Sequence, residues 1–587
     1  MKNFLSSLLA TIVGILIMTI LIILIFAGIV AASTAKEVPD VEENTLLVAK
    51  LNAPIPDRSD ENPFSQFFSP FPVMGKIMGL NHILNNIEKA GKDDNIKGIF
   101  LNLSSVPAGI ATIEEVRNAL LDFKKESGKF IYAYADILTQ SSYYLATAAD
   151  SIFMTPEGMF LFQGLGTEAL FFKNALEKLG IEMQVIRHGS YKSAAEMFTR
   201  EDLSEENREQ IEAYVGSIWA RMVEGISESR GISIETLNRY ADEMIAMEKD
   251  RAVETGMIDG LIYYDEMLSL MKDKLDVNEE DDLESISLKR YRDVPPQEKK
   301  AFSRDKIAVI YAMGMVVDGG EGEGYIGSER IARAIRKARR DESVKAIVFR
   351  VNSGGGSATA SDVICREAKL AAEEKPFVAS MGDVAASGGY YIAAPADTIL
   401  ASPNTITGSI GVVFTMPNLG ELMNEKLGIT TDVVKTNRHA DMFTVSGPLD
   451  EEERAIIRKS VEHTYDRFVQ VVAEGRNKTW QEVDSIGGGR VWSGTDALEI
   501  GLIDMFGGLE KSIEVAAEMA GLETYRIQSL PKLEDPFTMI MKELTGEAKM
   551  RMIRSELGNG YRYYRQLEDI KKMQGIQAIM PFSLEIH

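Results

Sequence analysis

One stretch of this chain of 587 residues has the composition expected around a nucleophile. Residues 380–391 read SMGDVAASGGYY and directly follow an apolar segment, with Ser387 standing before two glycines. The pattern predicts a strand, a tight turn and a helix that begins at Ser387. There the N–H of Gly388 would be one of the unpaired donors of a helix N-terminus, able to face a developing negative charge. A close packing corner between helix and sheet also selects Gly, Ala and Ser, so the stretch alone leaves both interpretations open.

A second stretch could supply the other donor of an oxyanion hole. Residues 352–356 read NSGGG and follow the apolar, β-branched run 346–351. A glycine loop after a strand can turn backbone N–H groups toward an oxyanion, and Gly355 or Gly356 would then complement Gly388. The alternative is an ordinary glycine-rich turn.

The chain repeats itself at a nearly constant offset, which makes one copy a control for the other. Four pairs of segments correspond, in the same order along the chain: 94–99 with 342–347, 143–150 with 390–397, 178–181 with 426–429, and 256–259 with 501–504.

The features that could do chemistry are divided between the copies. Ser387 corresponds to Gln140, and the glycine loop corresponds to residues 104–108, so the first copy lacks both. The reverse holds for Lys192, which corresponds to Ala440. A serine needs a base to remove its proton, and a lysine can be that base if burial lowers its pKa. We therefore expect two incomplete copies to assemble one site at their interface.

Other residues compete for these roles. His188 and His439 are alternative bases, but a histidine stands at nearly the same place in both copies, which favours a shared structural role. Ser409 could orient the lysine, or could be a plain turn serine. The five histidines and the single cysteine show no metal-ligand spacing, so the sequence predicts no metal and no other cofactor.

Short β-branched runs alternate with helical stretches rich in Ala, Glu, Lys and Arg, which predicts βαβ units and mostly parallel sheets. We expect an α/β protein of two tandem repeats, one at 45–275 and one at 305–525. A charged segment with two adjacent prolines, 276–304, would link them. Residues 530–587 would form a helical C-terminal extension, an arm packing on a neighbouring subunit.

The N-terminus predicts a membrane anchor. No charged residue occurs from 3 to 35, and this strongly apolar stretch is longer than the apolar core of a cleavable signal peptide. Lys2 precedes the stretch and acidic residues follow it, so residues 1–35 would form one transmembrane helix with the rest of the chain exported. The formal net charge of −24 argues against nucleic acid as a partner. Cys365, the single cysteine, excludes an intrachain disulfide.

Four motifs resemble those of signal peptide peptidase A, also called protease IV, in its long two-repeat form: residues 381–390, 407–412, 189–194 and 489–494. The resemblance implies a ClpP/crotonase-like fold with Ser387 as nucleophile and Lys192 as general base. It also implies that Ser409 orients the lysine and that Gly355 and Gly356 belong to the oxyanion loop. Gly354 stands where the family commonly has proline, which leaves open which loop glycine donates.

The resemblance further implies a homotetramer that degrades cleaved signal peptides. The predicted function is accordingly a serine endopeptidase for signal peptides and other apolar peptides, anchored in the cytoplasmic membrane with its catalytic part on the outer side. A crotonase-like acyl-CoA hydratase or isomerase is the alternative enzyme, and a scaffold derived from a peptidase is the alternative without catalysis. Labelling of Ser387 by an acylating probe would distinguish the peptidase from both.

Overall fold

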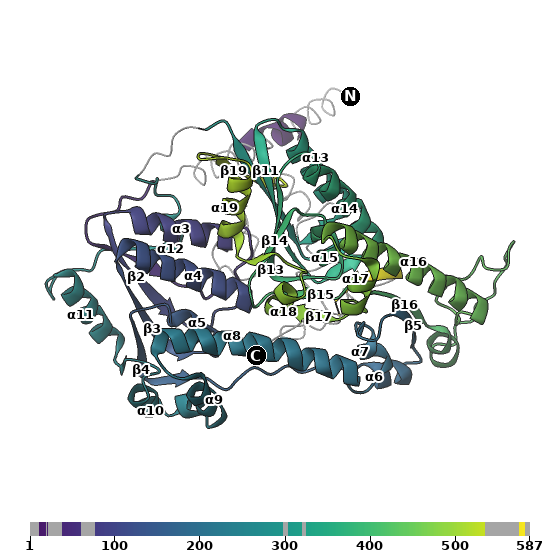
Figure 1. Cartoon of the computed structure of the whole chain (residues 1–587), viewed down its shortest axis with the longest axis horizontal. Helices are drawn as coiled ribbons and strands as arrows, with labels where there is room; N and C mark the ends of the chain where they lie inside the picture. The colour runs from purple at the N-terminus through teal and green to yellow at the C-terminus, as the bar shows by residue number, and fades with distance from the viewer. Residues whose placement is uncertain are drawn as a thin grey trace.

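The computed structural model describes residues 11–18, 20–21, 38–59, 77–297, 303–319, 324–533 and 575–580. Strands and helices alternate along most of this length, and the helices cover the sheets (Figure 1). Two of the three sheets are parallel or nearly so, as expected where each strand is followed by a helix that returns the chain to the same edge. The predicted α/β class with mostly parallel sheets is confirmed.

The first sheet is built from the first half of the chain and is entirely parallel. Its strand order is β6-β4-β3-β2-β1-β7. The strands are β1 (Thr45–Ala49), β2 (Ile96–Leu103), β3 (Phe130–Leu138), β4 (Ser151–Phe160), β6 (Gly260–Leu261) and β7 (Ser285–Ser287), and the main covering helices are α3 (Leu80–Lys92) and α4 (Ile110–Ser127).

The second large sheet repeats this order as β18-β14-β13-β11-β8-β19 and is extended beyond β13 by β15 and β17. Only the pairing of β15 with β17 is antiparallel. The strands are β8 (Lys306–Met313), β11 (Val344–Ser353), β13 (Phe377–Ala386), β14 (Thr398–Ala401), β15 (Ile406–Gly408), β17 (Val491–Ser493), β18 (Met505–Phe506) and β19 (Arg526–Leu530), and the helices include α13 (Ser328–Arg340), α14 (Ala358–Ala372) and α19 (Leu509–Met519).

The matched segments of the two repeats make the same contacts. Asp150 accepts the backbone N–H of Ile131 at the start of β3, and Asp397 accepts that of Phe377 at the start of β13. Each repeat also has a buried tyrosine, Tyr143 or Tyr390, whose hydroxyl donates to a backbone carbonyl just before the edge strand β6 or β18. These residues recur because they satisfy buried backbone groups at equivalent points of the sheets.

The third sheet joins the two repeats, with the order β10-β9-β12-β20-β16-β5. In it β5 (Glu182–His188) of the first repeat pairs antiparallel with β16 (Val412–Asn418) of the second along the full length of both strands. The long helix α8 (Glu205–Arg230) follows β5 and reaches from α5 (Gln140–Ala146) to β17 (Figure 1). The remaining members are β9 (Met315–Val317), β10 (Tyr325–Gly327), β12 (Gly355–Ser357) and β20 (Gly575–Ile579).

Three expectations for the ends and the linker have different outcomes. Residues 11–18 and 20–21 of the predicted anchor are helical, and its other residues lie outside those described. No helix within the described ranges has the length and hydropathy needed to cross a membrane. The helix predicted after 534 also lies outside them, and what is described of that extension, β20, is a strand. The predicted linker contains β7 and α12 (Leu288–Tyr291), because Ile286, Leu288 and Tyr291 are buried despite their charged neighbours.

A buried ion-pair network fastens one repeat to the other. Arg350 on β11 is fully buried and donates to Asp57 and to Glu115 of α4, each at 2.6 Å. Glu115 also accepts the N–H of Leu509 at the start of α19. Nearby, Asp383 on β13 accepts both the N–H and the hydroxyl of Thr112. The N-terminal half of α4 therefore packs against the second sheet through charged and polar side chains that are buried or half-buried.

Replacing Arg350 by methionine should destabilise the protein strongly. The change leaves Asp57 and Glu115 buried without their counter-ion, and breaking a buried pair from one side costs about 3–5 kcal/mol. Lys369→Met is the matched control, because it removes an exposed pair with Glu474, and exposed pairs contribute about 0–1 kcal/mol. The midpoints of urea unfolding measure both changes, and equal losses would contradict this account of the interface.

Candidate active site

Ser387 has an unusual backbone. It follows β13 and caps α15 (Gly388–Ala393) with φ of 55° and ψ of −117°, in a region that non-glycine residues seldom adopt. Its N–H donates to the carbonyl of Gly408, and its own carbonyl accepts the N–H of Tyr391. The side chain makes no capping bond, so the hydroxyl is available to other partners. The predicted strand, turn and helix are confirmed, with the serine at the turn.

Lys192 reaches this serine from the first repeat. Its side chain is fully buried, and its Nζ lies 2.7 Å from Ser387 Oγ. The two other hydrogen bonds of the amine go to Ser409, to its Oγ at 3.0 Å and to its carbonyl at 3.1 Å. All three partners are uncharged, and burial lowers the pKa of Lys192 well below its ordinary value. Residues far apart in sequence and divided between the repeats therefore meet in one buried cluster.

Glycines of the second repeat make room for the lysine. A Cβ on Gly489 would lie 2.6 Å from the backbone N and Cα of Lys192, and one on Gly411 would lie 3.1 Å from its Cδ. The carbonyl of Gly488 accepts the N–H of Tyr191. The 189–194 motif of one repeat and the 489–494 motif of the other are thus two sides of the same contact.

Ser409 is held in position by its backbone. Its φ is 51°, and its N–H donates to the carbonyl of Arg490 at 2.6 Å. The residue is fully buried, and both of its oxygens face Lys192 Nζ. A plain turn serine would be solvated, so this geometry favours the orienting role over the alternative.

The glycine loop lies beside the start of α15. The N of Gly388 is 2.7 Å from where a Cβ on Gly355 would stand, and Gly355 has φ of 101°. The N–H of Gly355 donates to Ser353 Oγ, and Gly356 pairs with Ala578 of β20 on one side and with Val316 of β9 on the other. The loop is itself a short strand, β12, rather than an irregular turn.

The equivalent place in the first repeat has a structural use. Gln140 is buried at the start of α5, and its side-chain oxygen accepts the N–H groups of Gln163 and Gly164. Its amide donates to the carbonyl of Gly164. Where the second repeat has Ser387, the first repeat has a glutamine that holds a loop.

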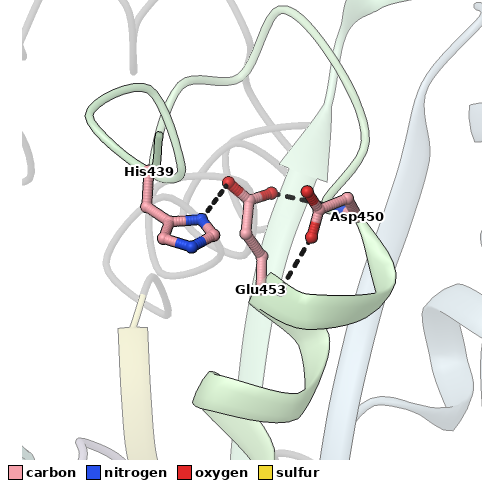
Figure 2. A group of neighbouring side chains, drawn as sticks. All are labelled: His439, Asp450 and Glu453. Carbon is pink, nitrogen blue, oxygen red and sulfur yellow. Dashed lines mark hydrogen bonds and ion pairs between the residues drawn. The ribbon is translucent and has the colours of Figure 1, made fainter. Parts of the chain in front are cut away.

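Neither rival histidine is hydrogen-bonded to Ser387 in the part of the chain that the structure describes. His188 stacks on Tyr465, with ring centroids 3.9 Å apart. His439 lies with Asp450 and Glu453 at the start of α16 (Glu451–Gly475), as Figure 2 shows.

This second cluster is the one group in the described ranges whose His and carboxylate atoms are close enough to share a metal ion. Its carboxylates already have a use in the helix cap, since Asp450 accepts the N–H of Glu453 and Glu453 accepts that of Asp450. His439 Nδ1 is 3.3 Å from Glu453 Oε1. His439 Nε2 lies 3.5 Å from Glu452 Oε1 as well, so the geometry is that of a helix cap with a histidine beside two of its glutamates.

Sequence reasoning missed a residue that supports the lysine. Gln210 on α8 is fully buried and donates to the carbonyl of Tyr191 and to Ser193 Oγ, while its side-chain oxygen accepts the N–H of Val491 in β17. It bonds at once to the loop of the first repeat and to a strand of the second. A single glutamine on a helix gives no sequence signal that it bonds the loop of Lys192 to a distant strand.

The family model for peptidase family S49 matches residues 123–278 and 369–523, one match in each repeat. The chain is 34% identical over 514 residues to a chloroplastic serine protease SPPA of Arabidopsis thaliana, an alignment that covers 86% of this chain and 74% of the relative. It is 35% identical over 477 residues to Protease 4 of Salmonella typhi, covering 80% of this chain and 76% of that protein.

Among solved structures, a ClpP1 mutant from Listeria monocytogenes aligns at 15% identity and a TM-score of 0.24, covering 35% of this chain and 94% of its own. That superposition adds nothing to the fold assignment, which rests on the sheet topology. The two family matches and the full-length relatives agree with the repeats that the strands display. The chain belongs to peptidase family S49, as a signal peptide peptidase A (protease IV) type of serine protease with two repeats.

Proposed function

We propose that the protein hydrolyses peptide bonds with Ser387 as nucleophile and Lys192 as general base. The observation that carries the proposal is the 2.7 Å contact between Lys192 Nζ and Ser387 Oγ in a fully buried site. Burial lowers the pKa of this amine and so favours the neutral form, whose lone pair can accept the serine proton. The contact joins the two residues that the repeats divide between them.

The reaction follows from this arrangement. Lys192 takes the hydroxyl proton as Ser387 Oγ attacks the scissile carbonyl, and the N–H of Gly388 and that of a loop glycine, Gly355 or Gly356, donate to the oxyanion. The ammonium of Lys192 then returns the proton to the leaving amine, which departs and leaves an acyl-enzyme. Water attacks the ester with Lys192 again as base, and Ser387 regains its proton.

The physiological setting extends the proposal. We infer that residues 1–35 anchor the protein in the cytoplasmic membrane and that the two repeats, 45–275 and 305–525, act on its outer side. Substrates there would be cleaved signal peptides and other apolar peptides, and the assembly would be a homotetramer. The support is the uncharged N-terminal stretch together with the family resemblance.

No observation favours the acyl-CoA hydratase or the scaffold. A hydratase has no need of a serine hydroxyl paired with a buried amine, and a scaffold has no need of either group. Modification of Ser387 in the intact protein, by phosphonylation with a fluorophosphonate probe or by acylation with a β-lactone probe, would agree with the peptidase alone.

Ser387→Ala and Lys192→Met should each lower the rate of hydrolysis of an apolar peptide by at least about a thousandfold, the usual effect of removing a member of such a unit. Methionine keeps the buried volume of Lys192 and removes only the amine. Lys192→Arg should fail as well, since a guanidinium stays protonated. Lys178→Met, which changes an exposed lysine, is the control and should keep wild-type turnover. Unchanged turnover in the first two variants would rule out the mechanism.

The pH dependence should report Lys192. The base acts only when neutral, so kcat/KM rises with pH through the pKa of the lysine and then levels off. Burial lowers that pKa, so the rise should lie well below the ordinary lysine value of 10.5. The profile is measured with an uncharged substrate, so that only the enzyme titrates. A midpoint near the ordinary value would mean that Lys192 is not the base.

Removing the hydroxyl of Ser409 should shift the same profile. Its oxygen accepts a hydrogen bond from Lys192 Nζ and so favours the charged amine, which means that its loss lowers the pKa further. In Ser409→Ala we expect the rise to move to lower pH and kcat to fall, because the amine has lost a partner that orients it. Ser409 has a positive φ, which glycine adopts without strain, so Ser409→Gly is the control. It should show the same shift of the profile and the same fall in kcat as Ser409→Ala. An effect in the alanine variant alone would point to backbone strain instead.

A further inference from the structure

Tyr465 on α16 contacts both sides of the interface that buries Lys192. The side chain is 1% exposed, and its ring stacks on His188 with ring centroids 3.9 Å apart. Its hydroxyl donates to Asp484 Oδ1 at 2.6 Å and accepts the N–H of Gly488 at 3.2 Å. His188 belongs to the first repeat, whereas Asp484 and Gly488 belong to the second. One side chain therefore holds a strand end of one repeat and a turn of the other.

The turn that Tyr465 holds is the one against which the lysine loop packs. A Cβ on Gly487 would lie 3.1 Å from the hydroxyl oxygen of Tyr465, so the turn fits closely against this hydroxyl. The carbonyl of Gly488 accepts the N–H of Tyr191 at 3.1 Å, and a Cβ on Gly189 would lie 2.2 Å from the same carbonyl oxygen. Backbone meets backbone here without intervening side chains, so a shift of the turn would displace the loop directly.

The strand end that Tyr465 holds leads into the same loop. His188 is the last residue of β5, and the loop of Lys192 begins at the next residue. The ring contact therefore sets where this loop leaves the third sheet. Burial, followed by the hydrogen bond to Asp484, raises the pKa of Tyr465 above its ordinary value, so the hydroxyl keeps its proton and remains a donor.

We infer that Tyr465 is a positioning residue for the general base, which it keeps in place by holding His188 and Gly488 on the two sides of the lysine loop. The inference rests on the proposed function, since it takes Lys192 as the base. The hydrogen bonds of the Tyr465 hydroxyl go to Asp484 and Gly488, so the residue acts on the amine through the backbone. A histidine close to the lysine thus belongs to the site without being its base.

Tyr465→Phe in the full chain keeps the ring and removes the hydroxyl. Gly488 and Asp484 then lose a hydrogen-bond partner, and the loosened turn should let water reach the amine. Because water favours the charged form, the pKa of Lys192 should rise toward its ordinary value, and the rise of kcat/KM should move to higher pH. This shift is opposite to that expected for Ser409→Ala. We expect kcat to fall about tenfold to a hundredfold through misplacement of the base, with KM unchanged.

Tyr291→Phe is the matched control. Tyr291 is also buried, and its hydroxyl also donates to an aspartate, Asp93 at 2.8 Å, but it lies on α12 beside the first sheet. Both variants should lose similar stability to urea, and only Tyr465→Phe should change the pH profile. An unchanged profile in Tyr465→Phe, or the same shift in both variants, would overturn the inference.

His188 offers a second test that leaves Tyr465 in place. His188→Ala removes the ring contact and should lower kcat and move the profile to higher pH. His188→Phe keeps an aromatic ring against Tyr465 and should have a much smaller effect on both. Equal effects in the two variants would contradict a positioning role for this contact.

Hydrogen exchange separates this inference from the proposed function, because it does not depend on activity. Backbone amides in 189–194 and 487–490 should exchange faster in Tyr465→Phe than in the wild type, and at the wild-type rate in Tyr291→Phe. Unchanged exchange in both segments of Tyr465→Phe would overturn the inference even if Lys192→Met is inactive. Full turnover in Lys192→Met would overturn the proposed function, whatever the exchange rates are.

Discussion

The burial of one amine is the constraint on which the rest of this structure depends. Contact with water or with a carboxylate would favour the charged form of Lys192. The amine is instead fully buried, and its hydrogen-bond partners are Ser387 Oγ and the two oxygens of Ser409. Desolvation lowers the pKa of Lys192, and the uncharged acceptors fix the direction in which the lone pair of its amine points. Gly411 and Gly489 follow from the same need, because any side chain there would fill the space that the lysine crosses.

The two repeats bury this amine together. By pairing β5 with β16, the third sheet carries the loop of Lys192 into the second repeat, where Gln210 bonds it to β17. The Arg350 network fixes the two sheets relative to each other at a distance from the site. The two copies differ at the site itself. Gln140 of the first repeat bonds to a loop, and Ser387 stands at the corresponding place in the second repeat.

Much of this was predictable from sequence because local signals and the repeat agreed. Alternating apolar and helical segments predicted the α/β class, and the turn at Ser387 followed from its small residues. The comparison of copies singled out Lys192, which composition could not do. The strand β7 was not predicted, because three buried residues in a charged stretch give too short a pattern. Gln210 and Arg350 were not predicted either, because their partners come from distant segments and no local pattern encodes such contacts.

The third sheet also meets the turn that carries Ser387, through β12. Ser387 is in a strained conformation that sets its hydroxyl toward Lys192, and its N–H is bonded to Gly408 at the end of β15. The next residue, Gly388, lies against Gly355 at the edge of β12, so a strand that pairs with β12 is aligned with Gly388 by its backbone alone. Recognition of this kind depends on the extended backbone of a peptide more than on its side chains.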